Sequence, residues 1–337
     1  MENPHRILII RFSSIGDIIL TTSPLVTIRN SYPDSEITFL TLEDFASLLE
    51  FHPCIDRIIK ISRKQSFKYH NQIAKHLKKC NFDMVFDLHN SIRSKFLSKA
   101  ASRKIFTIKK PRWKRWLLFQ FHYNVFPENF SVRRMYHNAL IDIWKNNEKI
   151  PNTGLILLSS EKDSAKLFLK NLGVSDQYIV IVPGAAWPNK IWPVEKYVDL
   201  INKIKTNMQV DTVLIGGKND HICYEINRTS RMTFNIAGRT SKRQSLAVMS
   251  LAIHVVGSDT GMVHAAEAIG ISATMILGPT SKETGAGTYL KASSNIEQSD
   301  LWCRPCSQNG KLKCFRSKQF CMEEIEVQQV YNSFFRT

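Results

Sequence analysis

The sequence predicts an α/β protein with two doubly wound domains, each a parallel sheet with helices on both faces. Two observations predict it. Short runs rich in Ile, Val and Phe alternate with segments of helical spacing, and this alternation occurs twice along the chain. The length of 337 residues is enough for two domains of ordinary size.

The first series begins with the apolar run at residues 6–12. A helix is expected over residues 17–33, where Pro33 closes it. The further strands of this series are expected at 36–41, 56–61 and 83–89. A junction at 151–177, which includes a polar helix over 159–173, then separates the two series.

The second series contains five strand-like runs that each end in glycine, which allows the chain to turn sharply out of the strand. These strands are expected at 178–184, 211–217, 232–238, 252–257 and 273–278, and the helices between them at 193–207, 220–230, 242–252 and 260–270.

Basic residues are concentrated in one segment of a chain whose net charge is +17. Ten Lys and Arg and no acidic residue lie between Leu88 and Arg115, and Trp113, Trp116 and Phe119 lie in or just beyond the end of this run. Such a field attracts nucleic acid, a phosphorylated glycolipid or an anionic membrane surface, although a solvated basic face with no partner stays possible. The candidates for contact with an anionic acceptor are Arg93, Lys95, Arg112, Lys114 and Arg115.

The sequence favours a soluble cytoplasmic protein. The first apolar run is about four residues long before Arg11, whereas a signal peptide needs about 7 to 15 and a membrane span about 20. Seven cysteines, an odd number, fit a reducing compartment better than a disulfide framework.

Asp17 lies where the first strand leads into the next helix. Ligands of open α/β sheets bind beyond the carboxyl ends of the strands, so we expect Asp17 to face a ligand cleft. One interpretation is that Asp17 only complements the helix dipole, with Ser13 or Ser14 as the N-cap. The other is that its carboxylate acts as a general base. The stretch is not a dinucleotide fingerprint, because Gly16 is its only glycine.

The second series offers two anion-binding elements. Lys190 stands beyond a strand and before a helix, where a lysine can meet a phosphate. The stretch 257–270 can form a capped helix whose first N–H groups receive an anion. The candidate residues are Lys190, Asp259, Thr260, Gly261, Met262 and His264. A lone histidine such as His264 is more often a core or capping residue than a catalytic one.

At these motifs the chain resembles glycosyltransferase family 9, the heptosyltransferases of lipopolysaccharide assembly. The motifs are "SSIGDIILTTSPL", "DLHNSIRSKFL", "PGAAWPNKIWPVEKY", "GSDTGMVHAAEAIG" with "GPTS", and the final cysteine-containing segment. The resemblance implies a GT-B fold, with two facing Rossmann-like domains, a deep cleft between them and a C-terminal helix crossing back to the first domain. The implied ranges are 1–165 for the acceptor domain, 166–320 for the nucleotide-sugar domain and 321–337 for the returning helix.

The resemblance also implies an activity. It is the inverting transfer of a heptosyl residue from ADP-heptose to the anionic inner core of lipopolysaccharide or a related cell-envelope glycan, with no catalytic metal. Asp17 matches the catalytic aspartate, Lys190 the lysine that meets donor phosphate, and 259–264 the donor-binding stretch. Such an enzyme would work at the inner face of the inner membrane of a Gram-negative bacterium, in peripheral contact with anionic lipid.

Four cysteines lie close together near the end of the chain. The spacing C-x2-C-x7-C-x6-C fits a tetrahedral structural zinc or iron site, and four unmetallated thiols are the alternative. These residues are Cys303, Cys306, Cys314 and Cys321.

Other functions stay open at this point. A glycosyltransferase of the same fold could use another donor or a protein acceptor, and a non-catalytic relative could bind nucleotide sugar. A basic nucleic-acid-binding protein would explain the charge, but the sequence contains no recognition motif of that class.

Overall fold

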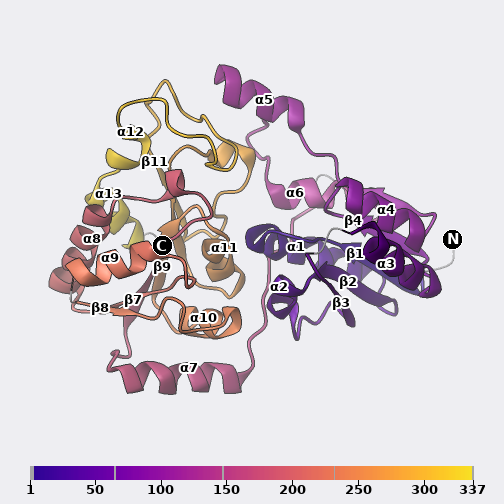
Figure 1. Cartoon of the computed structure of the whole chain (residues 1–337), viewed down its shortest axis with the longest axis horizontal. Coiled ribbons are helices and arrows are strands. Elements are labelled where there is room, and N and C mark those ends of the chain that lie inside the picture. Colours follow the sequence, from indigo (N-terminus) through magenta and orange to yellow (C-terminus); the bar gives the residue numbers. More distant parts are fainter. Residues whose placement is uncertain (1–3, 64–65, 146–147, 231, 336–337) are drawn as a thin grey trace. The chain divides into compact units, whose positions relative to one another are not determined.

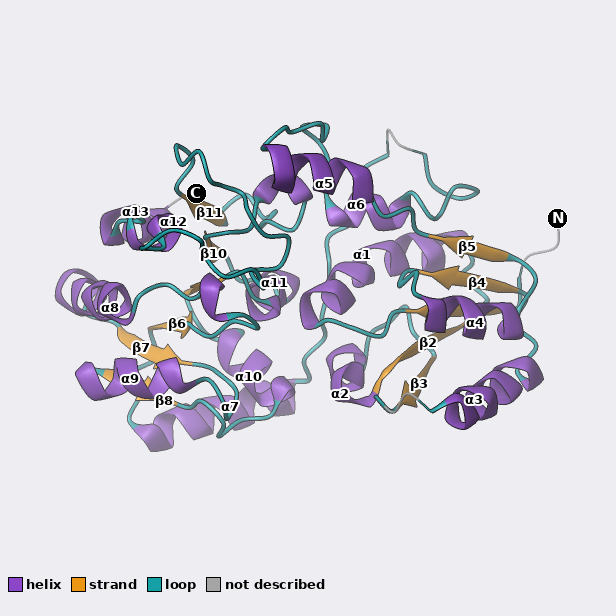
Figure 2. Cartoon of the chain, turned by 45° about the horizontal axis from the view of Figure 1, so that its top comes forward, coloured by secondary structure: helices purple, strands orange, loops and turns teal. Residues whose placement is uncertain are grey.

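A computed structural model describes residues 4–63, 66–145, 148–230 and 232–335. The chain forms two compact units (Figure 1). Unit 1 comprises Met1–Lys110 and Ser131–Ile156, and unit 2 comprises Pro111–Phe130 and Leu157–Thr337. Each unit contains a parallel sheet and its own helices (Figure 2), which confirms the predicted fold class.

Unit 1 contains a five-stranded sheet in the order β3-β2-β1-β4-β5, and every pairing is parallel. Its strands are β1 (Arg6–Ile10), β2 (Glu36–Leu42), β3 (Arg57–Ile61), β4 (Met84–Asp87) and β5 (Ile105–Thr107). The central strand β1 is buried from Ile7 to Ile10, because it has neighbours on both edges and helices nearby. That environment accounts for its continuous apolar sequence.

The helices of unit 1 form two groups of neighbours. Helix α1 packs against α6, and α4 packs against α3, β4 and β1. Helix α1 ends two residues before Pro33, as predicted. The elements are α1 (Ile15–Ser31), α2 (Glu43–Ala46), η1 (Ser47–Leu49), α3 (Phe67–Lys79), α4 (Ile92–Ala101) and α6 (Val132–His137).

Unit 2 contains a six-stranded parallel sheet in the order β11-β10-β9-β6-β7-β8. Read from β8, this is the 3-2-1-4-5-6 order of dinucleotide-binding folds. Its strands are β6 (Tyr178–Val182), β7 (Asp211–Leu214), β8 (Thr233–Asn235), β9 (His254–Ser258), β10 (Ala273–Leu277) and β11 (Ser294–Glu297).

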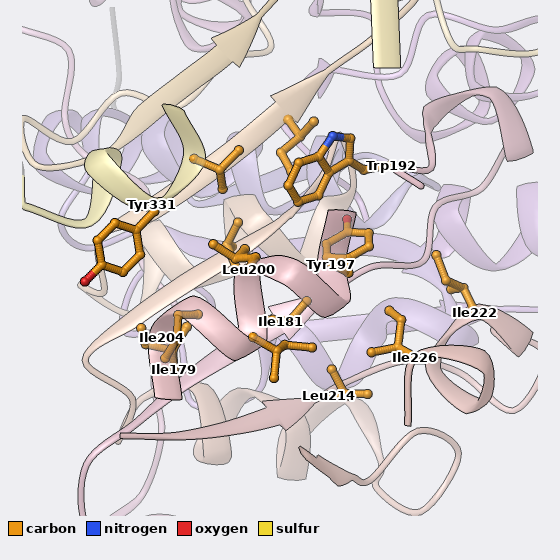
Figure 3. Packing of buried hydrophobic residues seen from close by; sticks show 14 of the residues in the cluster. Ile179, Ile181, Trp192, Tyr197, Leu200, Ile204, Leu214, Ile222, Ile226 and Tyr331 are labelled. Atoms are coloured by element: carbon orange, nitrogen blue, oxygen red, sulfur yellow. The ribbon is translucent and has the colours of Figure 1, made fainter. Parts of the chain in front are cut away.

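Helices cover both faces of this sheet. Alternate residues of β6 point to opposite faces: Ile179 and Ile181 join a core with α8, α9 and α13 (Figure 3), while the Tyr178 hydroxyl donates to the Val248 carbonyl of α10 at 2.6 Å. The elements are α5 (Arg112–Phe121), α7 (Ser159–Leu172), η2 (Pro188–Lys190), α8 (Val194–Met208), α9 (His221–Thr229), α10 (Lys242–Met249), α11 (Gly261–Ala268), η3 (Lys282–Thr284), α12 (Phe320–Glu323), α13 (Val327–Asn332) and η4 (Ser333–Phe335).

The division of the chain differs from the expected ranges at three places. The expected boundary after residue 165 falls inside α7, whereas the two units divide after Ile156. Helix α5 belongs to unit 2. The last helices pack within unit 2, where α13 lies on α8 and the Thr274 and Ser333 hydroxyls are 2.6 Å apart. Residues 336–337 of the expected returning helix lie outside the described residues.

Within the described ranges, every helix is too short or too polar to cross a membrane.

Candidate active site

Each sheet has one point where the strand order reverses. In unit 1 it lies between β1 and β4, and in unit 2 between β6 and β9. Ligands of such sheets bind beyond the carboxyl ends of the strands at this point. Asp17 follows β1, Lys190 follows β6 and Asp259 follows β9, so each unit carries predicted site residues at this position of its own sheet.

Asp17 lies in the first turn of α1 with 37% of its side chain exposed. Its Oδ2 atom forms an ion pair with Arg11 Nη2 at 2.6 Å and accepts hydrogen bonds from the Ser14 N–H at 3.2 Å and the Ser14 hydroxyl at 3.1 Å. Ser14 is the N-cap of α1, one of the two residues expected there. The carboxylate therefore belongs to the helix cap and to a tertiary ion pair at the same time.

Two residues that the sequence did not indicate complete the surroundings of Asp17. Arg11 is buried and donates to the carbonyls of Ser13 and Leu88, both at 2.7 Å. Tyr136, on α6, donates its hydroxyl to Asp17 Oδ1 at 3.0 Å. Partial burial by itself would raise the pKa of Asp17, but the Arg11 charge and the bonds from Ser14 and Tyr136 lower it below its usual value. Asp17 is therefore ionised at neutral pH.

The turn after β4 contributes further polar groups to unit 1. The Asp87 carboxylate accepts hydrogen bonds from the N–H groups of His89 and Asn90 at 3.0 and 2.8 Å, and Asn90 adopts a left-handed backbone with φ of 50°. The His89 ring lies 4.8 Å from the ring of Phe12, and Arg93 lies over the same Phe12 ring. Burial, followed by the charge of Arg11, lowers the pKa of His89 to about 3, so its imidazole is neutral.

The five predicted acceptor residues occupy two helices. Arg93 and Lys95 are on α4 of unit 1; Arg93 also donates to the Ser62 carbonyl at 3.0 Å, whereas Lys95 is exposed. The other three lie on α5, which belongs to unit 2; they are Arg112, Lys114 and Arg115.

Lys190 and Asp259 are brought together at the edge of the sheet of unit 2. Lys190 Nζ lies 3.0 Å from Asp259 Oδ2, with 11% and 17% of their side chains exposed. Their strands β6 and β9 are paired neighbours, and the Ser258 hydroxyl donates to the Pro183 carbonyl at 3.2 Å across the two strand ends. The sequence placed these residues on separate elements, and the parallel pairing explains why they meet.

Helix α11 begins beside this ion pair. Thr260 is its N-cap with extended backbone, and Gly261 and Met262 in its first turn are partly exposed. The first N–H groups of a helix have no partner within the helix and can bind an anion. His264 is 4% exposed and lies on the buried side of α11.

A loop from the cysteine segment covers Lys190. Gly310 has φ of +79°, and a Cβ there would lie 2.4 Å from Lys190 Cγ and 2.6 Å from Cδ. Asn189 fastens the same loop, since its amide donates to the Leu312 carbonyl at 2.6 Å. The position of Lys190 therefore depends on a segment about 120 residues further along the chain.

The structure does not support the predicted metal site. Among the described residues, no three His, Cys, Asp or Glu side chains come together as they must to hold a metal ion. Cys303 Sγ accepts a hydrogen bond from Arg316 at 3.6 Å, and the Cys314 thiol donates to the Lys318 carbonyl at 3.8 Å. Burial raises the pKa of Cys321 to about 11, which favours its protonated thiol. The sulfurs of Cys303 and Cys314 thus have hydrogen-bond partners within the same segment of the chain.

A cavity of about 320 Å³ lies between α7 and α10 of unit 2. Its lining includes Glu161, Phe168 and Arg239, and Arg243 forms an ion pair with Glu161 at 2.5 Å. The residues lining this cavity include none of the six donor candidates of the sequence.

Comparison with known proteins decides the family. The profile of glycosyltransferase family 9 (heptosyltransferase) matches residues 70–314. The chain belongs to glycosyltransferase family 9. It is 25% identical over 344 residues to lipopolysaccharide heptosyltransferase 1 of Campylobacter coli, covering 91% of this chain and 97% of that protein.

Solved structures of the family share the fold. A glycosyltransferase family 9 protein from Veillonella parvula superimposes with a TM-score of 0.80 at 21% identity, covering 99% of this chain and 97% of that one. The ADP-heptose lipopolysaccharide heptosyltransferase II of E. coli gives a TM-score of 0.75 at 19% identity, covering 97% of both chains. The predicted family and GT-B fold class are confirmed, and the chain is a glycosyltransferase.

Proposed function

We propose that this glycosyltransferase moves a heptosyl residue from ADP-heptose to the anionic inner core of lipopolysaccharide, with inversion at the anomeric carbon. The substrates are those in the names of its relatives, a lipopolysaccharide heptosyltransferase and an ADP-heptose transferase. The observation that carries the chemistry is the ionised, partly exposed carboxylate of Asp17 at the reversal point of the unit 1 sheet.

Asp17 is proposed to be the general base. It takes the proton of the acceptor hydroxyl while that oxygen bonds to the anomeric carbon of the sugar. The bond from this carbon to the diphosphate breaks on the opposite face, and its electron pair leaves with ADP. A low pKa keeps Asp17 in the form that accepts a proton.

Unit 2 is proposed to hold the donor. Negative charge grows on the departing diphosphate, and fixed cationic and N–H groups stabilise such charge. Lys190 is held by Asp259 at 3.0 Å, which orients its ammonium before a phosphate arrives. The proposed donor residues are Lys190, Asp259, Thr260, Gly261, Met262 and His264.

The acceptor carries phosphate and carboxylate groups, which suit the basic residues of α4 and α5. Exposed Lys95 and the half-buried guanidinium of Arg93 are the proposed contacts from unit 1. The three basic residues of α5, Arg112, Lys114 and Arg115, are the proposed contacts from unit 2.

Peripheral contact with the anionic inner face of the membrane is proposed for α5. Its exposed rings form one cluster: Trp113 and Trp116 are stacked at 4.6 Å, and Phe121 meets Trp116 edge-on at 5.0 Å. These side chains are 65%, 44% and 61% exposed, whereas Leu118 is 3% exposed. Aromatic and basic side chains on one short helix suit the lipid headgroup region.

The test is release of ADP when the protein is mixed with ADP-heptose and an inner-core acceptor. Release that requires both substrates supports heptosyl transfer to lipopolysaccharide. Parallel reactions with other nucleotide sugars and with protein acceptors, analysed by mass spectrometry, identify another donor or acceptor. No release with any donor, together with tight salt-dependent binding to DNA, would favour the nucleic-acid alternative.

A further inference from the structure

Tyr136 is a buried tyrosine whose hydroxyl donates to a carboxylate. It lies on α6, is 0% exposed, and donates to Asp17 Oδ1 at 3.0 Å. It is separated from Asp17 by 119 residues, and it belongs to none of the family motifs in the sequence. Its contact therefore needs an explanation of its own.

The two oxygens of Asp17 have different surroundings. Oδ2 receives three donors, one from Arg11 and two from Ser14. Each carboxylate oxygen has about two lone pairs, so Oδ2 is saturated. Among the described residues, Oδ1 accepts from Tyr136 alone. One acceptor position on Oδ1 is thus left for a further donor.

The tyrosine is held firmly in place. Helix α6 packs against α1, and the His137 ring and the Thr27 hydroxyl join the two helices at 3.2 Å. The Arg11 guanidinium lies 5.5 Å from the centre of the Tyr136 ring. The ring cannot rotate away from Asp17 without disturbing a buried contact, so its hydroxyl is a donor at a fixed position.

We infer that Tyr136 is a positioning residue that holds Oδ1 of Asp17 as the atom that receives the proton of the acceptor hydroxyl. This inference rests on the proposed role of Asp17 as general base. Tyr136 holds Oδ1 and Arg11 holds Oδ2, so the remaining lone pair of Oδ1 has a set direction. The proton moves from the acceptor oxygen to Oδ1, and Tyr136 keeps its own proton.

The variant Tyr136→Phe tests this inference, because it removes the hydroxyl and keeps the buried ring. We expect kcat to fall about 10-fold or more, as the loss of a hydrogen bond to a charged group predicts, while KM for the donor stays unchanged. Tyr178→Phe is the matched control: it also removes the hydroxyl of a buried tyrosine, one bonded to a backbone carbonyl, and it should leave kcat unchanged.

A double-mutant cycle with Asp17→Asn distinguishes an effect of Tyr136 on the position of Asp17 from an effect on the stability of the fold. If Tyr136 acts through Asp17, Tyr136→Phe should lower the residual rate of the Asp17→Asn enzyme by less than twofold. Melting temperatures of all variants show whether each is folded at the assay temperature, and a variant that melts low is assayed below its transition.

The outcomes distinguish this inference from the proposed function. Near-wild-type turnover of Asp17→Asn would remove the base role, and the inference with it. If Asp17→Asn is inactive but Tyr136→Phe has the kcat of the wild type, or a higher one, the inference alone is overturned. Equal losses of kcat in both backgrounds would also overturn it, because they would show an effect that does not pass through Asp17.

Discussion

Replacing Gly310 with alanine should disturb Lys190, the proposed donor-binding lysine. The new Cβ would lie 2.4 Å from Lys190 Cγ and 2.6 Å from Cδ, whereas carbon atoms in contact prefer about 3.5 to 4.0 Å. The lysine stem or the loop must therefore move by about 1 Å, the difference between about 3.5 Å and 2.4 Å. Alanine at φ of +79° adds a backbone cost of about 1 to 2 kcal/mol.

A shift of this size is large for a charge that is proposed to meet a diphosphate. Since displacement of a catalytic group by about 1 Å can cost about 100-fold, we expect kcat/KM for ADP-heptose to fall about 10- to 100-fold. The assay is ADP release at varied donor concentration, with thermal melting to measure stability.

Gly173→Ala provides the matched control. Gly173 has φ of +83° and no atom within 4 Å of the added Cβ, so this variant carries the backbone cost without the contact. It should melt at a lower temperature and keep its donor kinetics. If Gly310→Ala has the same donor kinetics as Gly173→Ala, the loop does not hold Lys190 for the reaction and the reasoning is wrong.

The other predictions concern the proposed base, the proposed donor lysine and α5. Asp17→Asn should lower kcat at least about 100-fold and leave ADP binding intact; turnover near that of the wild type would contradict the base assignment. Because the pKa of Asp17 lies below its usual value, the base loses its charge only as the pH falls through that low pKa, and rates should be level between about pH 5.5 and 7.5. A fall in kcat centred at pH 6 to 7 would indicate a different base. Lys190→Ala should worsen KM for the donor and kcat together, costing on the order of 1.5 to 4 kcal/mol in kcat/KM, and unchanged donor kinetics would place Lys190 outside the site. Changing Arg112, Lys114 and Arg115 together to alanine should raise KM for the acceptor and weaken binding to anionic liposomes, with ADP affinity unchanged. Added salt should weaken acceptor binding more than donor binding. If neither the triple substitution nor added salt changes acceptor binding, α5 is a solvated basic face without a partner.

Local patterns were enough to predict most of the fold. The central strands are continuous apolar runs because neighbours and helices bury them, so β1 and β6 are evident from sequence. Two edge strands, β5 and β11, were missed. They are three and four residues long and only partly buried, so neither has an apolar run to mark it.

The candidate site residues were proposed from local sequence, because ligands of parallel sheets bind beyond the carboxyl ends of the strands. Asp17, Lys190 and Asp259 each follow a strand closely, and the pairing of β6 with β9 explains the contact between the last two. The structure does not support the metal prediction, because that prediction depended on how a loop folds rather than on where strands end. The spacing of the cysteines limits how far apart they can lie, but the fold of the loop decides whether three possible ligands come together, and among the described residues none do.

The partners of these residues could not have been predicted from any local pattern. Tyr136 meets Asp17 only because α6 packs on α1, and Gly310 meets Lys190 only because the final loop folds back over η2. Both contacts join segments about 120 residues apart, and neither partner lies in a motif that names its role. An enzyme reacts more slowly when a carboxylate or ammonium group is misplaced, even though the residue itself is unchanged. Two chains with the same motifs can therefore differ in activity. The motifs supply the proposed reacting groups, and packing against segments distant in the sequence sets how well those groups are held.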